Sequence, residues 1–410
     1  MKELQEKYAR VILESCLGIE KGQSLFISGN IERIDFIRVL TKVAYELGVS
    51  DIYYDITDTY LKHDALKNLE VEDLKKMSFW NKGIWDIYAE KGAAFLMLAS
   101  EMPGLMSDID PKKVTEMTKY LYSTRKRFEE LRDKALVPWC IAAVPTELWA
   151  KELFKDSSNP VDELWNKIFK ICSIYEDDPV KIWNDKTSLL SERAKKLTNY
   201  HFKTLRYSNS KGTDFKVSLP KEAIWESGYS TLATGKKVLV NFPTEEVFTS
   251  PDCMSAEGIV YSSKPLSYQS TIINNFNITF KDGKAIESHA EKGDEALKAM
   301  INICENSNML GEVALVPYDS PISNSKQVFL ETLFDENASC HLALGDSFTE
   351  CIENGINMDK DVLFNEYHLN KCDSHVDFMV GTEDLNITGI TYDGKEIPIF
   401  INGNFTKEFN

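Results

Sequence analysis

The sequence predicts an α/β N-terminal domain with a mainly parallel sheet, followed by an α+β C-terminal domain whose strands are mostly antiparallel. In the first half, short apolar runs alternate with amphipathic segments of helix length, whereas the second half is a series of short strand-like runs. The chain has 410 residues, which is too long for one ordinary core. We therefore expect two domains, at residues 1–198 and 199–410.

The N-terminal half carries the pattern of strands separated by helices. Its strand candidates are residues 24–28, 50–56, 93–99 and 138–144, and helix-length segments such as Ile31–Leu47 separate them. This alternation is typical of a parallel sheet covered by helices, where ligands bind at the carboxyl ends of the strands. Neither a G-x-G-x-x-G nor a G-x-x-x-x-G-K-[ST] motif occurs, so a dehydrogenase or nucleotide enzyme is disfavoured.

The C-terminal half begins after a charged helix predicted at residues 191–200. The segments FKDGKAI and TYDGKEI each contain the Asp-Gly pair that is typical of a β-hairpin turn. A helix is expected around Glu291–Cys304. The remaining strand candidates are LRYS, DFKVSL, KKVLVNF, GIVYSS, STIINNFNITF, EVALV, HLALG, HVDFMV and EIPIFIN.

Composition excludes some classes of partner. The chain has 64 acidic and 47 basic residues, a net charge of -17, which argues against nucleic acid and anionic membrane surfaces as partners. The eight cysteines are scattered without a C-x-x-C pair, so we expect reduced thiols in a cytoplasmic protein. Charges interrupt the apolar residues at the N-terminus, and we expect neither a signal peptide nor a membrane span.

Carboxylates and histidines interrupt four apolar segments of the second half. These residues are Glu245 and Glu246 in NFPTEEVFTSPD, Glu312 in LGEVALVP, Glu336 and His341 in LFDENASCHLALG, and His375 and Asp377 in SHVDFMVG. A buried carboxylate without a partner costs several kcal/mol, and a shared cation is an economical partner. If SHVDFMVG is a strand, His375 and Asp377 project from the same face.

Each segment also has a simpler interpretation when it is taken alone. His375 and Asp377 can be a hydrogen-bonded pair, and Glu312 a partly exposed acid at a strand end. Glu245 and Glu246 can form a solvated turn, and because adjacent side chains on a strand diverge, at most one of them faces a shared site. These alternatives stay open at the level of single motifs.

Taken together, the set is rich in oxygen and contains two imidazoles. Such donors suit Zn²⁺, Co²⁺ or Mn²⁺ better than a thiolate site does. Five or six ligands exceed what one catalytic zinc ion requires, which predicts two ions that share a bridging carboxylate. The reaction class that this arrangement favours is hydrolysis.

The same four segments, in this order, strongly resemble those of the thermophilic-type metalloaminopeptidases, the family of aminopeptidases T, S and II. The likeness continues in the first half, in YARVILESCLGIEKGQSLFI, VAYELGVSDIYYDITD and VPTELWA, and it covers essentially the whole chain. The resemblance implies a cytoplasmic, homodimeric metalloaminopeptidase that acts on peptides with a free N-terminus and uses two divalent metal ions. The metal ligands that it implies are Glu246, Glu312, Glu336, His341, His375 and Asp377.

The resemblance also suggests roles for two glutamates and reveals one departure. Glu312 is expected to bridge both ions, and Glu245 is a candidate proton shuttle, although a solvated or capping role for Glu245 stays open. The family usually has a tyrosine seven residues after the histidine of DENAS-x-H, where this chain has Phe348. A tyrosine hydroxyl can donate to the oxyanion of a hydrolytic intermediate. Three alternatives stay open: a hydroxyl of Ser347 or Thr349 substitutes, the metal ions alone suffice, or turnover is reduced, in the extreme to a catalytically weak or inactive metal-binding scaffold.

Overall fold

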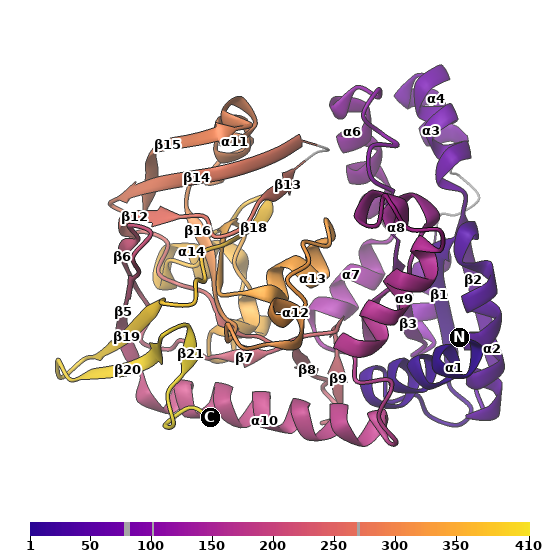
Figure 1. The fold of residues 1–410 in the computed structure, drawn as a ribbon, viewed down its shortest axis with the longest axis horizontal. Coiled ribbons are helices and arrows are strands. Elements are labelled where there is room, and N and C mark those ends of the chain that lie inside the picture. Colours follow the sequence, from indigo (N-terminus) through magenta and orange to yellow (C-terminus); the bar gives the residue numbers. More distant parts are fainter. Residues whose placement is uncertain (78–82, 101, 269–270) are drawn as a thin grey trace. The chain divides into compact units, whose positions relative to one another are not determined.

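The computed structural model describes residues 1–77, 83–100, 102–268 and 271–410 (Figure 1). Within it the chain forms two compact units. Unit 1 contains residues 1–186 and 229–243, and unit 2 contains residues 187–228 and 244–410. The segment 229–243 thus returns to the first unit after the chain has entered the second. The division into domains 1–198 and 199–410 stays a prediction.

Unit 1 is built on a five-stranded sheet in which every neighbouring pair is parallel, in the order β10-β4-β3-β1-β2. All four strands predicted in the first half are confirmed, and a two-residue strand from segment 229–243 joins them at one edge. Phe26 and Phe95 stack in the core on one face of this sheet. The strands of unit 1 are β1 (Ser24–Asn30), β2 (Asp51–Thr57), β3 (Ala94–Ala99), β4 (Trp139–Ala143), β8 (Tyr229–Thr231), β9 (Lys237–Leu239) and β10 (Asn241–Phe242).

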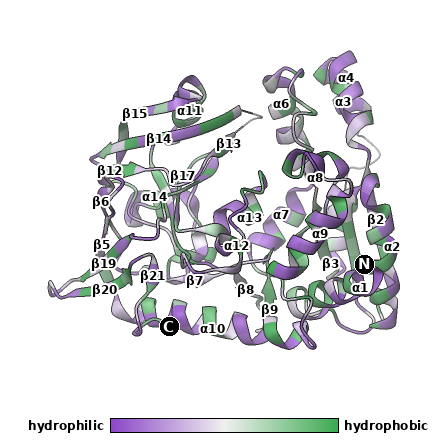
Figure 2. Cartoon of the chain, viewed as in Figure 1, coloured by the Kyte–Doolittle hydropathy of each residue, from purple (hydrophilic) through white to green (hydrophobic). Residues whose placement is uncertain are grey.

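Helices separate the parallel strands along the chain, as the sequence pattern predicts. They are α1 (Lys2–Arg10), α2 (Ile34–Glu46), α3 (Thr59–Asn68), α4 (Val71–Met77), α5 (Ile84–Glu90), α6 (Pro111–Ser123), α7 (Lys126–Asp133), α8 (Glu147–Leu153) and α9 (Pro160–Ile171), with shorter turns at Val11–Cys16 and Ile31–Arg33. Helix α10 (Pro179–Tyr200) follows and begins earlier than predicted. Hydrophobic and hydrophilic bands alternate along it, as an amphipathic helix requires (Figure 2).

Unit 2 contains two groups of antiparallel strands, which confirms the predicted fold class. The first group runs in the order β18-β17-β16-β11-β7. Its members are β7 (Glu226–Ser227), β11 (Val247–Thr249), β16 (Leu310–Leu315), β17 (His341–Gly345) and β18 (His375–Met379). This group carries most of the residues that the sequence singles out as metal ligands.

The second group is a nine-stranded sheet in the order β13-β14-β12-β6-β5-β19-β20-β21, with β15 paired to β14. Both Asp-Gly turns are confirmed, because Asp282-Gly283 joins β14 to β15 and Asp393-Gly394 joins β19 to β20. The strands are β5 (Phe202–Ser208), β6 (Asp214–Ser218), β12 (Glu257–Tyr261), β13 (Leu266–Tyr268), β14 (Thr271–Lys281), β15 (Lys284–Lys292), β19 (Asn386–Thr391), β20 (Glu396–Ile401) and β21 (Asn404–Phe405).

Apart from the part of α10 that begins at Thr187, the helices of unit 2 are short. The helix expected around Glu291–Cys304 is α11 (Asp294–Ile301), because Glu291 and Lys292 still belong to β15. The others are α12 (Pro321–Asn324), α13 (Thr332–Asp335) and α14 (Lys360–Tyr367), with 3-10 turns at Glu336–Ala338, Thr349–Cys351 and Gly355–Asn357. Across the ranges that the structure describes, no helix combines the length and the apolar character needed to cross a bilayer.

Candidate metal centre

Three neighbouring strands place four of the six predicted ligands on one face of a sheet. Glu312 of β16 and Asp377 of β18 both lie opposite Ala343 of the central strand β17. Residues that face each other across strands project to the same side, and so do residues two apart on one strand. His341, two residues before Ala343, and His375, paired with Gly345, therefore share the face of Glu312 and Asp377. The small Ala343 side chain lies between the two carboxylates.

The opposite face of the same strands is apolar and belongs to the core of unit 2. Val313, Leu342 and Phe378, each next to one of the polar positions, are fully buried in it. Side chains of a strand alternate between the two faces, so burying these residues fixes the direction of the polar ones. A one-residue slip in register would send the carboxylates into the core.

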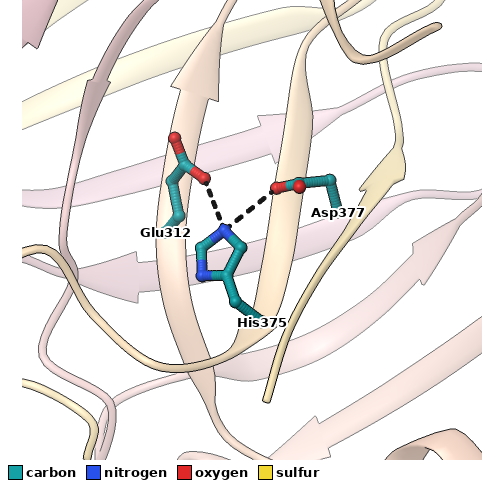
Figure 3. Close-up of side chains that lie close together, drawn as sticks. All are labelled: Glu312, His375 and Asp377. Atoms are coloured by element: carbon teal, nitrogen blue, oxygen red, sulfur yellow. Dashed lines mark hydrogen bonds and ion pairs between the residues drawn. The ribbon is translucent and has the colours of Figure 1, made fainter. Parts of the chain in front are cut away.

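Glu312, His375 and Asp377 form the tightest group (Figure 3). His375 Nε2 lies 3.2 Å from Glu312 Oε2 and 3.3 Å from Asp377 Oδ1. One potential ligand atom from each of the three residues lies within 4.8 Å of the others. Asp377 Oδ1 is buried, and among the described residues it has the ion pair with His375 but no further hydrogen bond. A carboxylate oxygen in this state is a suitable ligand for a cation.

A second pair and a further glutamate complete the predicted set. His341 Nε2 lies 3.5 Å from Glu246 Oε2, and both side chains are buried. Glu246 comes from the loop just before β11, and Glu336 from the 3-10 turn that follows α13. The pKa of Glu336 is raised well above its ordinary value by burial and by the carboxylates of Asp377, Glu246 and Glu312. All six predicted ligands thus contribute to one electrostatic cluster.

The two imidazoles are oriented in the same way, through backbone carbonyls. His375 Nδ1 lies 2.8 Å from the carbonyl oxygen of Asp346, and His341 Nδ1 lies 3.2 Å from that of Ser339. Nδ1 is then the donor in each ring, and Nε2 faces the carboxylates. This second hydrogen bond fixes the ring and its tautomer in the way that is common for metal-ligating histidines.

Burial and mutual repulsion make the cluster costly to ionise. Burial raises the pKa of Glu246 to about 8 and that of Glu312 to about 7. Burial opposes ionisation of Asp377 as well, but the His375 imidazolium lowers the pKa of Asp377 to about 2. Burial alone would lower the pKa of His375, whereas Asp377 and Glu312 raise it well above its usual value. Without another cation, His375 therefore carries the positive charge that the acids require.

The donor set fits a divalent metal ion. It offers carboxylate oxygens and imidazole nitrogens, the ligands that hard and borderline divalent ions prefer, and no thiol of the described chain joins the group. Cys340, next to His341, instead donates through Sγ to the carbonyl oxygen of Val316. His368, also near in sequence, lies 3.2 Å from Asp252 through Nδ1.

Comparisons with known proteins agree with this chemistry. The family model described as thermophilic metalloprotease (M29) matches residues 1–405. The chain belongs to this family. It is 37% identical over 409 residues to aminopeptidase 2 of Geobacillus stearothermophilus and 36% identical over 407 residues to aminopeptidase PepS of Streptococcus thermophilus, with at least 98% of each chain covered. The solved structure of wild-type AmpT from Thermus thermophilus superposes with a TM-score of 0.91 at 31% identity, covering 99% of both chains.

Family membership confirms the resemblance stated from sequence and the predicted class of function, a metal-dependent aminopeptidase. The use of a divalent metal ion is supported by the family and by the Glu312, His375 and Asp377 group. The names of the relatives do not assign individual residues. The six ligands therefore stay predictions, although the structure gathers them in unit 2.

Sequence reasoning missed Asn337, which lies inside the DENAS segment. Asn337 is fully buried, and its Oδ1 accepts a hydrogen bond from the backbone N–H of Glu245 at 2.8 Å. Its Nδ2 donates to the carbonyl oxygen of Leu333 at 3.1 Å and to Glu336 Oε1 at 3.4 Å. One amide thus connects the segments that carry Glu246 and Glu336. Its position inside a candidate motif, directly after Glu336, was the available signal.

Phe348 lies against the histidine of the tightest group. Its ring centroid is 5.0 Å from that of His375 and 5.2 Å from that of Phe248. The nearby Ser347 hydroxyl accepts a hydrogen bond from the backbone N–H of Asn370 at 2.9 Å. The position at which the family resemblance implies a tyrosine therefore holds an apolar ring beside the candidate metal-binding face.

Proposed function

We propose that this chain removes N-terminal residues from peptides with a free N-terminus, using two divalent ions held by Glu246, Glu312, Glu336, His341, His375 and Asp377. The observation that carries the proposal is the group formed by Glu312, His375 and Asp377, in which the only partner of the buried Asp377 Oδ1 among the described residues is the His375 ring. A metal-dependent aminopeptidase is what family membership supports. The number of ions and the complete ligand set go further and belong to this proposal.

The chain's own residues divide into two pairs around a central carboxylate. His375 and Asp377 lie beside Glu312, while His341 and Glu246 lie beside each other. We therefore assign Glu312 as the ligand shared by both ions, with Glu336 close to the set. Two divalent ions in such a site supply Lewis acidity toward a carbonyl and lower the pKa of a water molecule. Zn²⁺, Co²⁺ and Mn²⁺ all suit these donors.

Glu245 is our candidate for moving the proton to the leaving amine. It is buried next to Glu246, and its backbone is fixed by Asn337. We assign it this role because it is the buried acid that directly precedes a proposed ligand in the chain. The carboxylate is also close enough to Arg193 to raise the pKa of that guanidinium, against the larger effect of burial, which lowers it to about 10. A structural role toward Arg193 is the competing assignment.

Cytoplasmic location and homodimer formation are further parts of the proposal. All eight cysteines are free, and six of them are buried, as is common in a reducing compartment. The homodimer rests on the family resemblance alone. A catalytically weak metal-binding scaffold is the second candidate, and the specific observation in its favour is Phe348 at the position of the family tyrosine.

The proposal is tested by loading the purified protein with Zn²⁺, Co²⁺ or Mn²⁺ and measuring bound metal and peptide cleavage. We expect two ions per chain and release of the first residue from unblocked peptides, with no cleavage of the N-acetylated forms. Glu312→Gln should remove at least one ion and reduce cleavage by more than 10³-fold, since the shared ligand and its charge are lost. Glu366→Gln, an exposed change in α14, is the matched control.

Three results would separate the candidates. Full activity of Glu312→Gln contradicts the assigned centre. Two bound ions with no cleavage of any peptide favours the scaffold, and cleavage of N-acetylated peptides contradicts an aminopeptidase.

A further inference from the structure

We propose that Cys304 and Cys372 are the site of a reversible disulfide. Their sulfur atoms lie 3.2 Å apart, although the two residues are separated by 68 positions in the chain. Cys304 lies in the loop after α11, and Cys372 in the segment that leads into β18. The pair is thus formed by the fold of unit 2 and not by a local sequence motif.

Both sulfurs are more accessible than the other thiols of the chain. Cys304 and Cys372 are partly exposed, whereas the remaining six cysteines are buried. Oxidation of thiols follows exposure as well as ionisation. A small oxidant should therefore reach this pair before the thiols in the cores.

The backbone around the pair is already held in place. Asn306 Nδ2 donates to the carbonyl oxygen of Lys371 at 3.1 Å, and Asn370 Nδ2 donates to that of Asn306 at 3.0 Å. These bonds tie the two loops together two residues after Cys304 and one to two residues before Cys372. A disulfide has an S–S length of about 2.05 Å, so closing the bond requires a movement of roughly 1 Å.

The pair is connected to the proposed metal-binding face. The backbone N–H of Cys372 donates to Asp346 Oδ1 at 3.1 Å, and the carbonyl oxygen of Asp346 lies 2.8 Å from His375 Nδ1. A bond to Cys304 would anchor the segment that orients His375. Formation of the disulfide does not depend on the proposed function. Only its effect on His375 as a metal ligand rests on that function.

The chemistry balances with hydrogen peroxide as the oxidant. We write the first oxidation on Cys304, and exchanging the roles of the two sulfurs leaves the balance unchanged. The Cys304 thiolate attacks one peroxide oxygen, the O–O bond breaks, and a sulfenic acid and one water form. The Cys372 sulfur then attacks the Cys304 sulfur, the S–O bond breaks, and a second water leaves. Two thiols and one peroxide give one disulfide and two waters.

The chain offers a clean test by peptide mapping. Trypsin should release residues 299–326 with Cys304 as the only cysteine and residues 372–395 with Cys372 as the only cysteine. After peroxide treatment, alkylation of free thiols and digestion without reductant, we expect these two peptides linked in wild-type protein and separate after dithiothreitol. Cys304→Ser and Cys372→Ser should both abolish the linked species, and Cys253→Ser, at a buried thiol, should retain it.

A second readout is thermal unfolding of the metal-loaded protein. The bond closes a long loop, so the oxidised wild type should melt about 5 °C or more above the reduced form, and neither serine variant should show this shift. Recovery of peptides 299–326 and 372–395 only as separate species under excess peroxide would overturn the proposal. So would linkage of either peptide to another cysteine in preference to its partner.

Discussion

At the scale of single residues, the site depends on which ring nitrogen of each histidine faces the carboxylates and which is hydrogen-bonded to the backbone. His341 and His375 direct Nδ1 to a backbone carbonyl and Nε2 to carboxylates. His368 instead meets the Asp252 carboxylate through Nδ1. When Nδ1 donates its hydrogen to a neutral backbone carbonyl, no charge is added beside the ring. Nε2 then remains available to bind a cation. This difference separates the two candidate ligands from their neighbour.

Phe348→Tyr tests what the missing family hydroxyl contributes. Phe348 packs 5.0 Å from the His375 ring, so an added hydroxyl is placed beside the metal-binding face. If this hydroxyl donates to the oxyanion, kcat for an unblocked peptide should rise by about 10²-fold, and KM should change little. Phe364→Tyr, in α14, controls for adding a hydroxyl elsewhere. An unchanged or lower kcat in Phe348→Tyr would show that this chain does not use a donor at that position.

At the scale of elements, the direction of the site follows from strand register. Alternation places His375 and Asp377 on one face from sequence alone, and the structure adds Glu312 and Asp377 on either side of Ala343. The four long parallel strands were predictable because each is a bounded apolar run. The two residues of β10 lie in the predicted strand KKVLVNF, but their parallel pairing with β4 was not predictable, because this segment returns to unit 1 from the second half of the sequence. The backbone carbonyl partners of the histidines and the hydrogen bonds of Asn337 could not be predicted from the sequence either. They depend on which loops meet in the folded chain.

Asn337→Ala tests the connection between two loops of the site. The variant removes the acceptor for the Glu245 N–H and the donor to Glu336. We expect metal affinity to fall about 10–100-fold, and a loss of roughly 1–3 kcal/mol in the free energy of unfolding because a buried N–H is left unsatisfied. Competition with a chromophoric chelator measures the affinity, and Asn365→Ala, at an exposed position in α14, is the control.

Asn337→Asp distinguishes positioning from simple destabilisation. It keeps an acceptor for the Glu245 N–H but places a negative charge beside Glu336. Stability should partly recover while metal affinity stays altered. Equal metal affinity in wild type and Asn337→Ala would show that Asn337 does not position the metal ligands.

At the scale of the whole molecule, unit 2 folds around a group of charges that oppose its stability. Glu246 and Glu312 are buried and Glu336 is half-buried beside them, and loss of hydration raises the pKa of each. A buried charge without compensation costs several kcal/mol. Divalent ions that bind only the folded chain offset this cost, so metal loading and folding of unit 2 should be linked.

The pH dependence of unfolding provides the sharpest test of this linkage. The folded-state pKa values of Glu246 and Glu312, about 8 and about 7, lie above the ordinary value of 4.5. From pH 4.5 up to the folded-state pKa values, the folded, metal-free chain binds more protons than the unfolded chain. The free energy of unfolding therefore falls as pH rises through this range. The stability that these two groups contribute is complete below pH 4.5 and is lost as pH passes through 7 and 8. Bound ions replace the protons and should remove most of this loss.

We therefore expect the difference in melting temperature between metal-loaded and chelator-treated protein to widen from pH 5.5 to pH 8. The same proton release requires metal affinity to rise with pH, up to tenfold per pH unit for each proton displaced. Calorimetry across this range measures the melting temperatures, and Glu312→Gln serves as the matched variant, because it removes one of the two titrating groups and should flatten the dependence. A difference that is constant with pH, or that narrows as pH rises, would mean that Glu246 and Glu312 do not exchange protons for metal.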